Sequence, residues 1–480
     1  MNIVRTEVAV IGAGTAGLTA YRAARLGGKQ AVLIESGPYG TTCARVGCMP
    51  SKLLIAAAEA AHAVAAAPAF GVYPASVRVD GAAVMARVRS ERDRFVGFVL
   101  DGVEQIPAED KIRGHARFIG PGLLQIDQHT RVEAGRIVIA TGSTPIVPPE
   151  WQQAGARVIS SDGVFDWTDL PESVAVAGSG VIGLELGQAL HRLGVRVAIY
   201  ARGGSVAQLS DPLVREAAAQ ALSQELDLRF QTDIVAVERD GEQLAVTSRD
   251  GTGQLRTERY AYLLSAIGRS PNVHQLGLDA AGIALDRRGI PLYDRHTMQC
   301  GDSAIFIAGD ADAERPLLPE AADQGRIAGA NAARYPDVQP GLRRTPLAIA
   351  FSEPQIASAG ASYSELGASH GGRHAIGQVS FEDQGRSRVM LQNQGLLRVY
   401  AEFGTGRFLG AEMVGPRAEH LGHLLAWACQ AGLTVQAMLD MPFYHPVVEE
   451  GLRTALRDLE QHLARGPQDV HPCADCTPGA

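Results

Sequence analysis

The sequence contains little of what marks several classes of protein. Its 480 residues include only six cysteines, and 44 Lys and Arg against 52 Asp and Glu give a formal net charge of −8. So few cysteines exclude a secreted scaffold held together by disulfides. A net-acidic chain without a basic run is a poor candidate for binding nucleic acid or an anionic membrane. The Ala-rich run from Leu53 to Ala67 contains Glu59 and His62, so we expect no membrane-spanning helix.

The composition and the N-terminus favour a globular cytoplasmic protein. Hydrophobic residues make up 46% of the chain and charged residues 20%, which is enough apolar surface for ordinary cores. At about 150 residues per domain, the length predicts roughly three domains. The chain starts directly with an apolar strand and shows no basic region followed by a cleavage site, so we predict a cytoplasmic location.

Two segments follow the same strand, glycine turn and helix plan. Glu7–Ile11 is followed by a GxGxxG turn, a helix to about Leu26 and a second strand that ends at Glu35. Ser173–Ala177 is followed by the same elements, and its second strand ends with Tyr200-Ala-Arg202. This arrangement predicts two dinucleotide-binding βαβ units, in which the pyrophosphate lies at the N-terminus of the helix. The glycines concerned are Gly12, Gly14 and Gly17 in the first unit and Gly178, Gly180 and Gly183 in the second.

The two units differ at the residue that selects the nucleotide. Glu35 is placed to hold a ribose hydroxyl, whereas the second unit has no acid at the end of its strand. Arg202 can instead bind a 2′-phosphate, or it can be a solvated turn residue. The choice between NAD and NADP therefore stays open.

A pair of cysteines carries the clearest chemical signal. Cys43 and Cys48 lie five residues apart at the start of a predicted helix, whose N-terminus lowers the pKa of a nearby thiol. Such a pair beside a bound dinucleotide suits two-electron thiol–disulfide exchange. No histidine or further cysteine lies nearby in the sequence, so we predict no metal site.

Together these motifs resemble the flavoprotein pyridine nucleotide–disulfide oxidoreductases over about residues 5 to 460. The Cys43–Lys52 stretch ends in Pro-Ser-Lys, and the matching motifs follow in the family's order. The further motifs are Ala140-Thr141-Gly142, Gly268-Arg-Ser-Pro-Asn272, Gly309-Asp310 and His445-Pro446 with Glu450.

The resemblance implies an α/β fold of two dinucleotide-binding three-layer domains and a C-terminal α/β dimerisation domain. The implied division is an FAD-binding domain in two parts (1–150 and 271–345), an NAD(P)-binding domain (151–270), a dimerisation domain (346–465) and a flexible CxxC tail (466–480). A homodimer is therefore expected.

The resemblance also implies roles for single residues. FAD is expected on Gly12, Gly14, Gly17, Glu35, Lys52, Thr141, Gly142, Gly268 and Asp310, and NAD or NADP on Gly178, Gly180, Gly183 and Arg202. Cys48 is the sulfur next to the flavin, and Cys43 is the sulfur that exchanges with substrate. Lys52 pairs with Glu185 to gate hydride passage. His445, oriented by Glu450, acts as the base from the opposite subunit.

Two alternatives remain for the substrate. The Pro-Ser-Lys ending resembles lipoamide dehydrogenases and mercuric reductases, and mercuric reductases lack the His–Glu pair. We therefore predict a dihydrolipoamide dehydrogenase that acts on a lipoyl-bearing carrier protein. The alternative is an NADPH-dependent disulfide or metal-ion reductase that uses Cys473 and Cys476, although the tail can also have no role.

Overall fold

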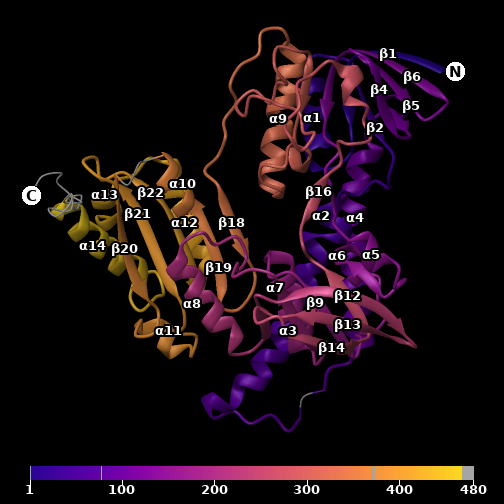
Figure 1. Ribbon diagram of the computed structural model, residues 1–480. Coiled ribbons are helices and arrows are strands. Elements are labelled where there is room, and N and C mark those ends of the chain that lie inside the picture. Colours follow the sequence, from indigo (N-terminus) through magenta and orange to yellow (C-terminus); the bar gives the residue numbers. More distant parts are fainter. Residues whose placement is uncertain (1, 77, 370–372, 467–480) are drawn as a thin grey trace, which may run out of the picture. The chain divides into compact units, whose positions relative to one another are not determined.

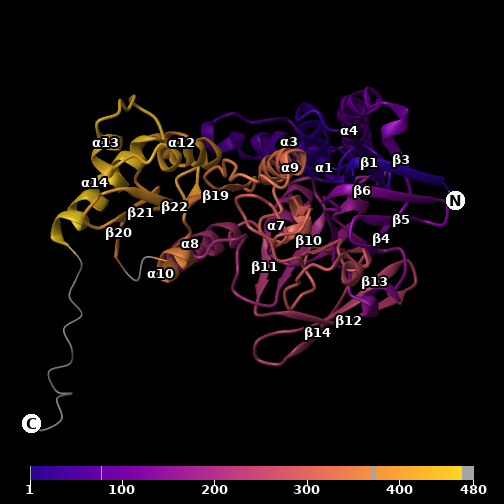
Figure 2. The same ribbon diagram turned by 90° about the horizontal axis from the view of Figure 1, so that it is seen from above.

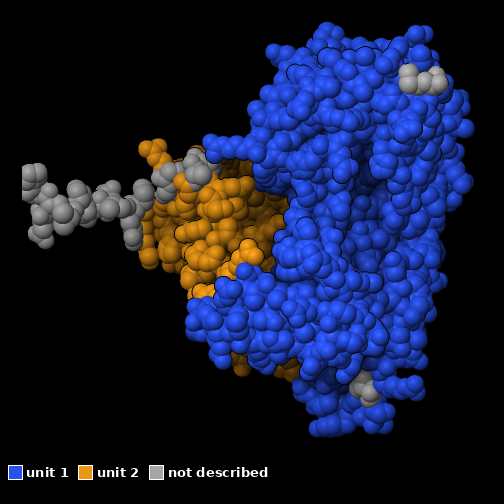
Figure 3. All heavy atoms as spheres, turned by 45° about the vertical axis from the view of Figure 1, so that its right-hand side comes forward, with its two compact units in different colours: residues 1–178, 189–200, 232–344 blue, residues 179–188, 201–231, 345–480 orange. Residues whose placement is uncertain are grey.

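The computed structural model describes residues 2–76, 78–369 and 373–466, so Cys473 and Cys476 lie outside the described residues. The chain divides into two compact units, coloured separately in Figure 3. Unit 1 comprises residues 1–178, 189–200 and 232–344, and unit 2 comprises residues 179–188, 201–231 and 345–480.

The first sheet of unit 1 is built on the N-terminal strand. Its strand order is β3-β2-β1-β6-β5-β4, with β17 paired to β6. The pairs β2–β1, β1–β6 and β6–β17 are parallel. The strands are β1 Asn2–Ile11, β2 Ala31–Glu35, β3 Lys111–Arg113, β4 Ala116–Gly120, β5 Leu123–Ile126, β6 Thr130–Ile139 and β17 Ile305–Ile307.

The sheet is buried on both faces because alternate side chains of β1 enter different cores. Val8 and Val10 join the cluster formed with α1 (Thr15–Leu26) and α9 (Leu318–Arg334), whereas Ala9 and Ile11 join the cluster on the other face. Figure 1 shows α1 and α9 side by side. This close approach depends on α9 glycines, since a Cβ on Gly325 would lie 2.2 Å from the Ala16 carbonyl oxygen. The result is the three-layer arrangement expected of a dinucleotide-binding domain.

The cysteine segment forms two helices, where the sequence predicted one. Helix α2 (Thr42–Val46) ends before Gly47, and α3 (Cys48–Ala66) starts directly after it. A Cβ on Gly47 would lie 3.1 Å from both Cys43 Cα and the Thr42 carbonyl oxygen, so glycine permits the tight break. By length and composition alone, the run Thr42–Phe70 is long and apolar enough to cross a membrane. This corrects our expectation that no segment is, although a single such helix is weak evidence for a membrane span.

The second dinucleotide motif repeats the strand arrangement of the first. In unit 1, parallel strands run in the order β10-β9-β15-β8, and the antiparallel sheet β12-β13-β14 lies in the same unit. The strands are β8 Val158–Ser160, β9 Ser173–Ala177, β10 Arg196–Ala201, β12 Asp233–Asp240, β13 Gln243–Arg249, β14 Leu255–Tyr260 and β15 Tyr262–Ser265. Helix α7 (Val181–Arg192) follows the glycine turn.

Unit 2 contains an antiparallel sheet in the order β18-β19-β22-β21-β20. Figure 2 shows helices α12 to α14 on one face of this sheet and α8 and α10 on the other. The strands are β18 Leu347–Ala350, β19 Gln355–Gly360, β20 His374–Ser380, β21 Leu396–Glu402 and β22 Phe408–Gly415. The helices are α8 Pro212–Ser223, α10 Tyr363–Ser369, α12 Ala418–Gln430, α13 Val435–Leu439 and α14 Glu450–Arg465.

Candidate active site

The first glycine turn is shaped to accept a dinucleotide. Gly12 has φ +104°, and a Cβ there would lie 2.3 Å from the Ala140 carbonyl oxygen, while a Cβ on Gly17 would lie 1.8 Å from the Gly12 carbonyl oxygen. A Cβ on Gly14 would meet no atom within 4 Å. Helix α1 has no side-chain cap and no acid in its first turn, so its first amides are available to an anion.

Glu35 organises the loop that follows the second strand. One carboxylate oxygen accepts the amide of Ala13 at 2.7 Å, and the other accepts the amide of Gly37, also at 2.7 Å. The carboxylate is thereby fixed beside the glycine turn, where a ribose hydroxyl can still donate to its remaining lone pairs.

Three predicted segments meet at the carboxyl end of the first sheet. Strands β7 (Ser143–Pro145) and β16 (Arg269–Pro271) pair antiparallel directly after Gly142 and Gly268. The Ser143 hydroxyl donates to Asp310 at 2.6 Å. Arg269 donates to the Ser143 hydroxyl at 2.8 Å and to its carbonyl at 2.7 Å. The structure thus gathers Thr141, Gly142, Gly268 and Asp310, as the sequence predicted, and adds Ser143 and Arg269.

The Thr141 hydroxyl in this group is a polar atom that a bound ligand could satisfy. Among the described residues, the Thr141 hydroxyl is buried without a hydrogen-bond partner. A buried hydroxyl without a partner is costly, and a bound polar ligand would satisfy it. With the open space at Gly14 and the fixed carboxylate of Glu35, the residues present fit an adenine dinucleotide of the FAD type.

Cys43 and Cys48 come together across the break between α2 and α3, and both are in the thiol form. Hydrogen bonding to Cys48, together with burial, raises the pKa of Cys43 well above its usual range. Cys48 is the first residue of α3, where the helix dipole favours a thiolate. Lys52 lies one helical turn later on the same face. This arrangement favours Cys48 as the sulfur that ionises first.

The imidazole of His445 is oriented by Glu450, as the sequence predicted. Its Nδ1 lies 3.0 Å from one carboxylate oxygen and 3.2 Å from the other. Glu450 also accepts from Arg453 at 2.9 Å and from the Val447 amide at 3.3 Å. The hydrogen bond with His445 holds the pKa of Glu450 below its usual range. Because Nδ1 faces the carboxylate, Nε2 is the nitrogen that can exchange a proton with substrate.

The His445 side chain is 80% exposed, whereas Glu450 is 18% exposed. An exposed base in front of a half-buried carboxylate suits a residue that acts on another molecule or subunit. The predicted action of His445 as a base from the opposite subunit stays a prediction. Arg453 was not predicted, although its position one helical turn after Glu450 was a usable signal.

Other predicted residues are placed without a test of their roles. Glu185 is 4% exposed on α7 and accepts the Phe351 amide at 2.9 Å. Its pairing with Lys52 stays a prediction, since the two residues belong to different units. Gly178 has φ +106°, and a Cβ on Gly180 would meet no atom within 4 Å, while Gly183 is buried in α7. Arg202 is exposed in the loop after β10.

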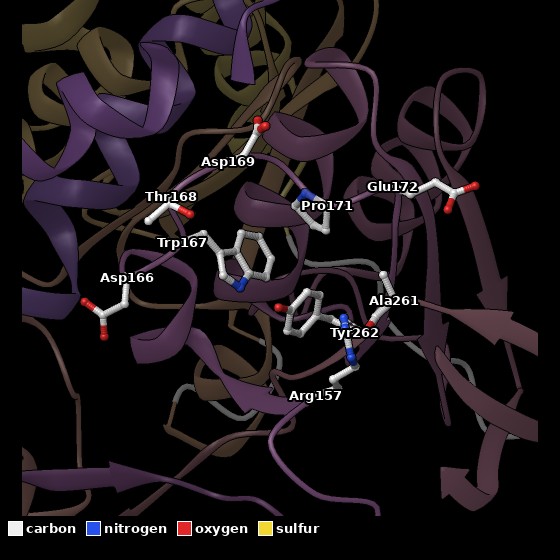
Figure 4. Close-up of a pocket in the computed structure, with 9 residues that line it drawn as sticks. All are labelled: Arg157, Asp166, Trp167, Thr168, Asp169, Pro171, Glu172, Ala261 and Tyr262. Carbon is white, nitrogen blue, oxygen red and sulfur yellow. Dashed lines mark hydrogen bonds between the residues drawn. The ribbon is translucent and has the colours of Figure 1, made fainter. Parts of the chain in front are cut away.

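A surface pocket of about 480 Å³ lies in unit 1, outside these motifs. The rings of Trp167 and Tyr262 lie 5.1 Å apart in it, and the Arg157 guanidinium lies over Tyr262. In Figure 4 the carboxylates of Asp166, Asp169 and Glu172 point away from these rings. The three carboxylates are therefore turned away from the aromatic part of the pocket.

Comparison with family models decides the family. The pyridine nucleotide-disulphide oxidoreductase model matches residues 6–333, and its dimerisation-domain model matches residues 347–456. The chain is a pyridine nucleotide-disulphide oxidoreductase. The predicted family and α/β fold are thereby confirmed, and enzymes of this family use FAD and NAD(P)H. The dimerisation domain supports a homodimer.

Relatives of this oxidoreductase include two kinds of enzyme. A mercuric reductase of Shigella flexneri is 33% identical over 95% of this chain and 81% of its own length. A mercuric reductase of Streptomyces lividans is 30% identical over 96% of this chain and 97% of its own length. Dihydrolipoyl dehydrogenase 3 of Pseudomonas aeruginosa is 29% identical over 94% of this chain and 97% of its own length.

Solved structures agree on the fold of this oxidoreductase. LpdA from Mycobacterium tuberculosis has a TM-score of 0.79 at 26% identity, covering 95% of this chain and 99% of its own. The HOCl-induced flavoprotein disulfide reductase RclA from Escherichia coli has a TM-score of 0.77 at 23% identity, with the same coverage. Both structures share the fold of this oxidoreductase.

Proposed function

We propose that this oxidoreductase is a dihydrolipoamide dehydrogenase, which oxidises a protein-bound dithiol and passes two electrons to NAD(P). The observation that carries the proposal is the hydrogen bond between His445 Nδ1 and Glu450, 3.0 Å long. A proton acceptor held in one tautomer is what a dithiol substrate needs, because a thiol attacks a disulfide only as the thiolate.

The chemistry balances on the residues of this chain. His445 Nε2 takes a proton from one thiol of the substrate, and the thiolate attacks the Cys43 sulfur of the oxidised pair. The Cys43–Cys48 bond breaks, and Cys48 leaves as a thiolate. The second substrate thiol then attacks the substrate sulfur of the mixed disulfide and passes its proton to the leaving Cys43 sulfur. The substrate disulfide is released, Cys43 is left as a thiol, and His445 keeps the first proton. The substrate loses two electrons, and the cysteine pair gains them.

FAD, when bound, would supply the redox chemistry that links the cysteine pair to the nicotinamide nucleotide. Gly12, Gly14 and Gly17 would hold its pyrophosphate, Glu35 its ribose, and Asp310 its ribityl side. Lys52 and Glu185 would gate the passage between the two nucleotides. Hydrogen bonding to Cys48 and burial raise the pKa of Cys43, which favours the thiol form of Cys43 in the reduced pair.

The test is anaerobic turnover of free dihydrolipoamide by the holoenzyme. His445→Gln should lower kcat by about a hundredfold or more, because a positioned base contributes about 10²–10⁴. His445→Gln should oxidise NAD(P)H with ferricyanide at the wild-type rate, because this reaction does not involve the cysteine pair. His420→Gln, an exposed histidine on α12, is the matched control and should behave as the wild type. The proposal fails if the wild type does not oxidise dihydrolipoamide, or if His445→Gln retains full activity.

A second candidate is a metal-ion or disulfide reductase driven by NADPH, which the mercuric reductase relatives favour. It would use Cys473 and Cys476. The experiment is NADPH oxidation dependent on Hg²⁺ in excess thiol, before and after deletion of residues 466–480. Loss of that activity with retained dihydrolipoamide turnover would assign the tail a second reaction. Absence of any Hg²⁺-dependent oxidation would eliminate this candidate.

A further inference from the structure

The two dinucleotide motifs can be aligned by their hydrogen bonds as well as by sequence. The amide of Gly12 donates to the Ile34 carbonyl at 2.7 Å, and the amide of Gly178 donates to the Tyr200 carbonyl at 2.8 Å. The next strands also correspond, since Ala140 donates to Ile11 and Ala266 donates to Ala177, each at 2.8 Å. The backbone register therefore makes Ile34 equivalent to Tyr200.

It follows that Ala201 stands where the first motif has Glu35. Ala201 is 3% exposed and presents only a methyl group, so it cannot accept hydrogen bonds from a ribose diol. The second motif therefore lacks the acceptor that favours a nucleotide with free 2′- and 3′-hydroxyls.

The loop after Ala201 carries a cation at the protein surface. Arg202 is exposed, and it is the only charged residue between positions 201 and 210. A Cβ on Gly203 or Gly204 would meet no atom within 4 Å, so a ligand group can approach this backbone. A planar guanidinium followed by two exposed glycine amides is suited to bind a phosphate.

The loop is also fixed at both ends. The Ser179 hydroxyl donates to the Ser205 carbonyl at 2.6 Å, and the Ala207 amide donates to the Ser179 carbonyl at 2.9 Å. Further on, buried Glu412 accepts the amides of Ser210 at 2.7 Å and Asp211 at 2.9 Å. Arg202 therefore extends from a loop tied to the glycine turn that holds the nucleotide.

We infer that the second motif selects NADP(H) over NAD(H), and that Arg202 binds the 2′-phosphate. The inference rests on the family's use of NAD(P)H and is independent of which dithiol or metal ion is the substrate. The selectivity has two parts: an attractive contact at Arg202 and, at Ala201, the loss of the contact that NAD would use.

The experiment compares NADPH and NADH as donors to ferricyanide, using the flavin-loaded protein. The wild type should show a higher kcat/KM with NADPH, by about tenfold or more, because a charge-assisted contact to phosphate contributes about 1.5–3 kcal/mol. Arg202→Ala should lower kcat/KM for NADPH by about the same factor and change that for NADH much less, so that the preference for NADPH is lost. Calorimetry should show that 2′,5′-ADP binds the wild type more tightly than 5′-ADP, and that Arg202→Ala removes the difference.

Arg249→Ala, at an exposed arginine at the end of β13, is the charge-matched control and should keep the wild-type preference. The flavin absorbance of each variant reports whether it has folded. A wild-type preference for NADH overturns the inference, and so does a preference for NADPH that survives in Arg202→Ala. Neither result depends on dihydrolipoamide, so failure here is distinct from failure of the proposed dithiol reaction.

Discussion

The two dinucleotide motifs have the same backbone arrangement. In each, a carboxylate orders the loop after the second strand, but the two carboxylates come from different parts of the chain. In the first motif it is Glu35, at the end of the same strand, which accepts the amides of Ala13 and Gly37. In the second it is Glu412, on β22, which is 1% exposed and accepts the amides of Ser210, Asp211 and Tyr363. The first loop is ordered by an acid of its own motif, whereas the second is ordered by an acid far away in the sequence, and in our proposal Arg202 supplies the ligand contact there.

This difference shows how one backbone plan can serve two nucleotides. The glycine turn is dictated by the path of the chain and recurs in both motifs. The residue that contacts the ribose is free to change because another part of the fold can take over the support of the loop.

The largest expected effect is the loss of nucleotide binding when a glycine of either turn is replaced. Gly12→Ala and Gly178→Ala each place a Cβ against a carbonyl oxygen, at 2.3 Å and 2.5 Å, at positions with φ above +100°. Each should cost about 2–4 kcal/mol locally. Gly12→Ala should abolish FAD retention, whereas Gly178→Ala should keep the flavin and lose tight NAD(P)H binding. Flavin absorbance and nucleotide titration measure the two outcomes.

Gly241→Ala is the control for this comparison, since Gly241 has φ +57° but a Cβ there meets no atom within 4 Å. It should keep both nucleotides. Equal loss of both nucleotides in Gly12→Ala and Gly178→Ala would show that the turns do not act separately.

An intermediate effect tests the distant carboxylate. Glu412→Ala leaves the amides of Ser210, Asp211 and Tyr363, of which that of Asp211 is buried, without their acceptor, so it should destabilise the protein by about 2–4 kcal/mol. It should also raise KM for the nicotinamide nucleotide more than KM for the dithiol. Thermal unfolding and steady-state kinetics measure these effects. Glu460→Ala, an exposed acid on α14, should change neither; an unchanged melting temperature in Glu412→Ala would contradict the proposed support.

The smallest effect concerns a buried acid behind the first motif. Asp312 follows Asp310, and burial raises its pKa to about 6. Because the folded-state pKa is raised, the favourable contribution of the protonated form is present below about pH 4 and is lost as the pH rises through 6. Asp312→Asn should therefore gain stability relative to the wild type by about 1–2 kcal/mol between pH 4.5 and 7. Urea unfolding of both proteins at pH 4.5 and 7 measures this gain. A stability difference between variant and wild type that is the same at both pH values would contradict the raised pKa of Asp312.

The sequence was a good guide wherever the chemistry is local. The glycine spacing, Glu35, the cysteine pair and the His445–Glu450 spacing each lie within a short stretch, so a helix or turn of known geometry brings their members together. The helix break at Gly47 was not predicted, and the close approach of Gly47 to Cys43 identifies it in the structure.

Long-range partners were less predictable. Ser143 and Arg269 lie 126 residues apart and meet only because β7 and β16 pair. Glu412 gave no signal, because one acid in a strand pattern is ordinarily exposed, and the packing of β22 against the start of α8 is what buries it.

By itself, the sequence determined which chemistry is available: two phosphate-binding turns, a dithiol at a helix start and an imidazole paired with a carboxylate. These depend on spacings of a few residues, which backbone geometry converts directly into positions. Only the tertiary structure decided which side chains support those groups, because contacts such as those of Ser143 with Asp310 and Glu412 with Ser210 join segments that are far apart in the chain and meet only when it folds.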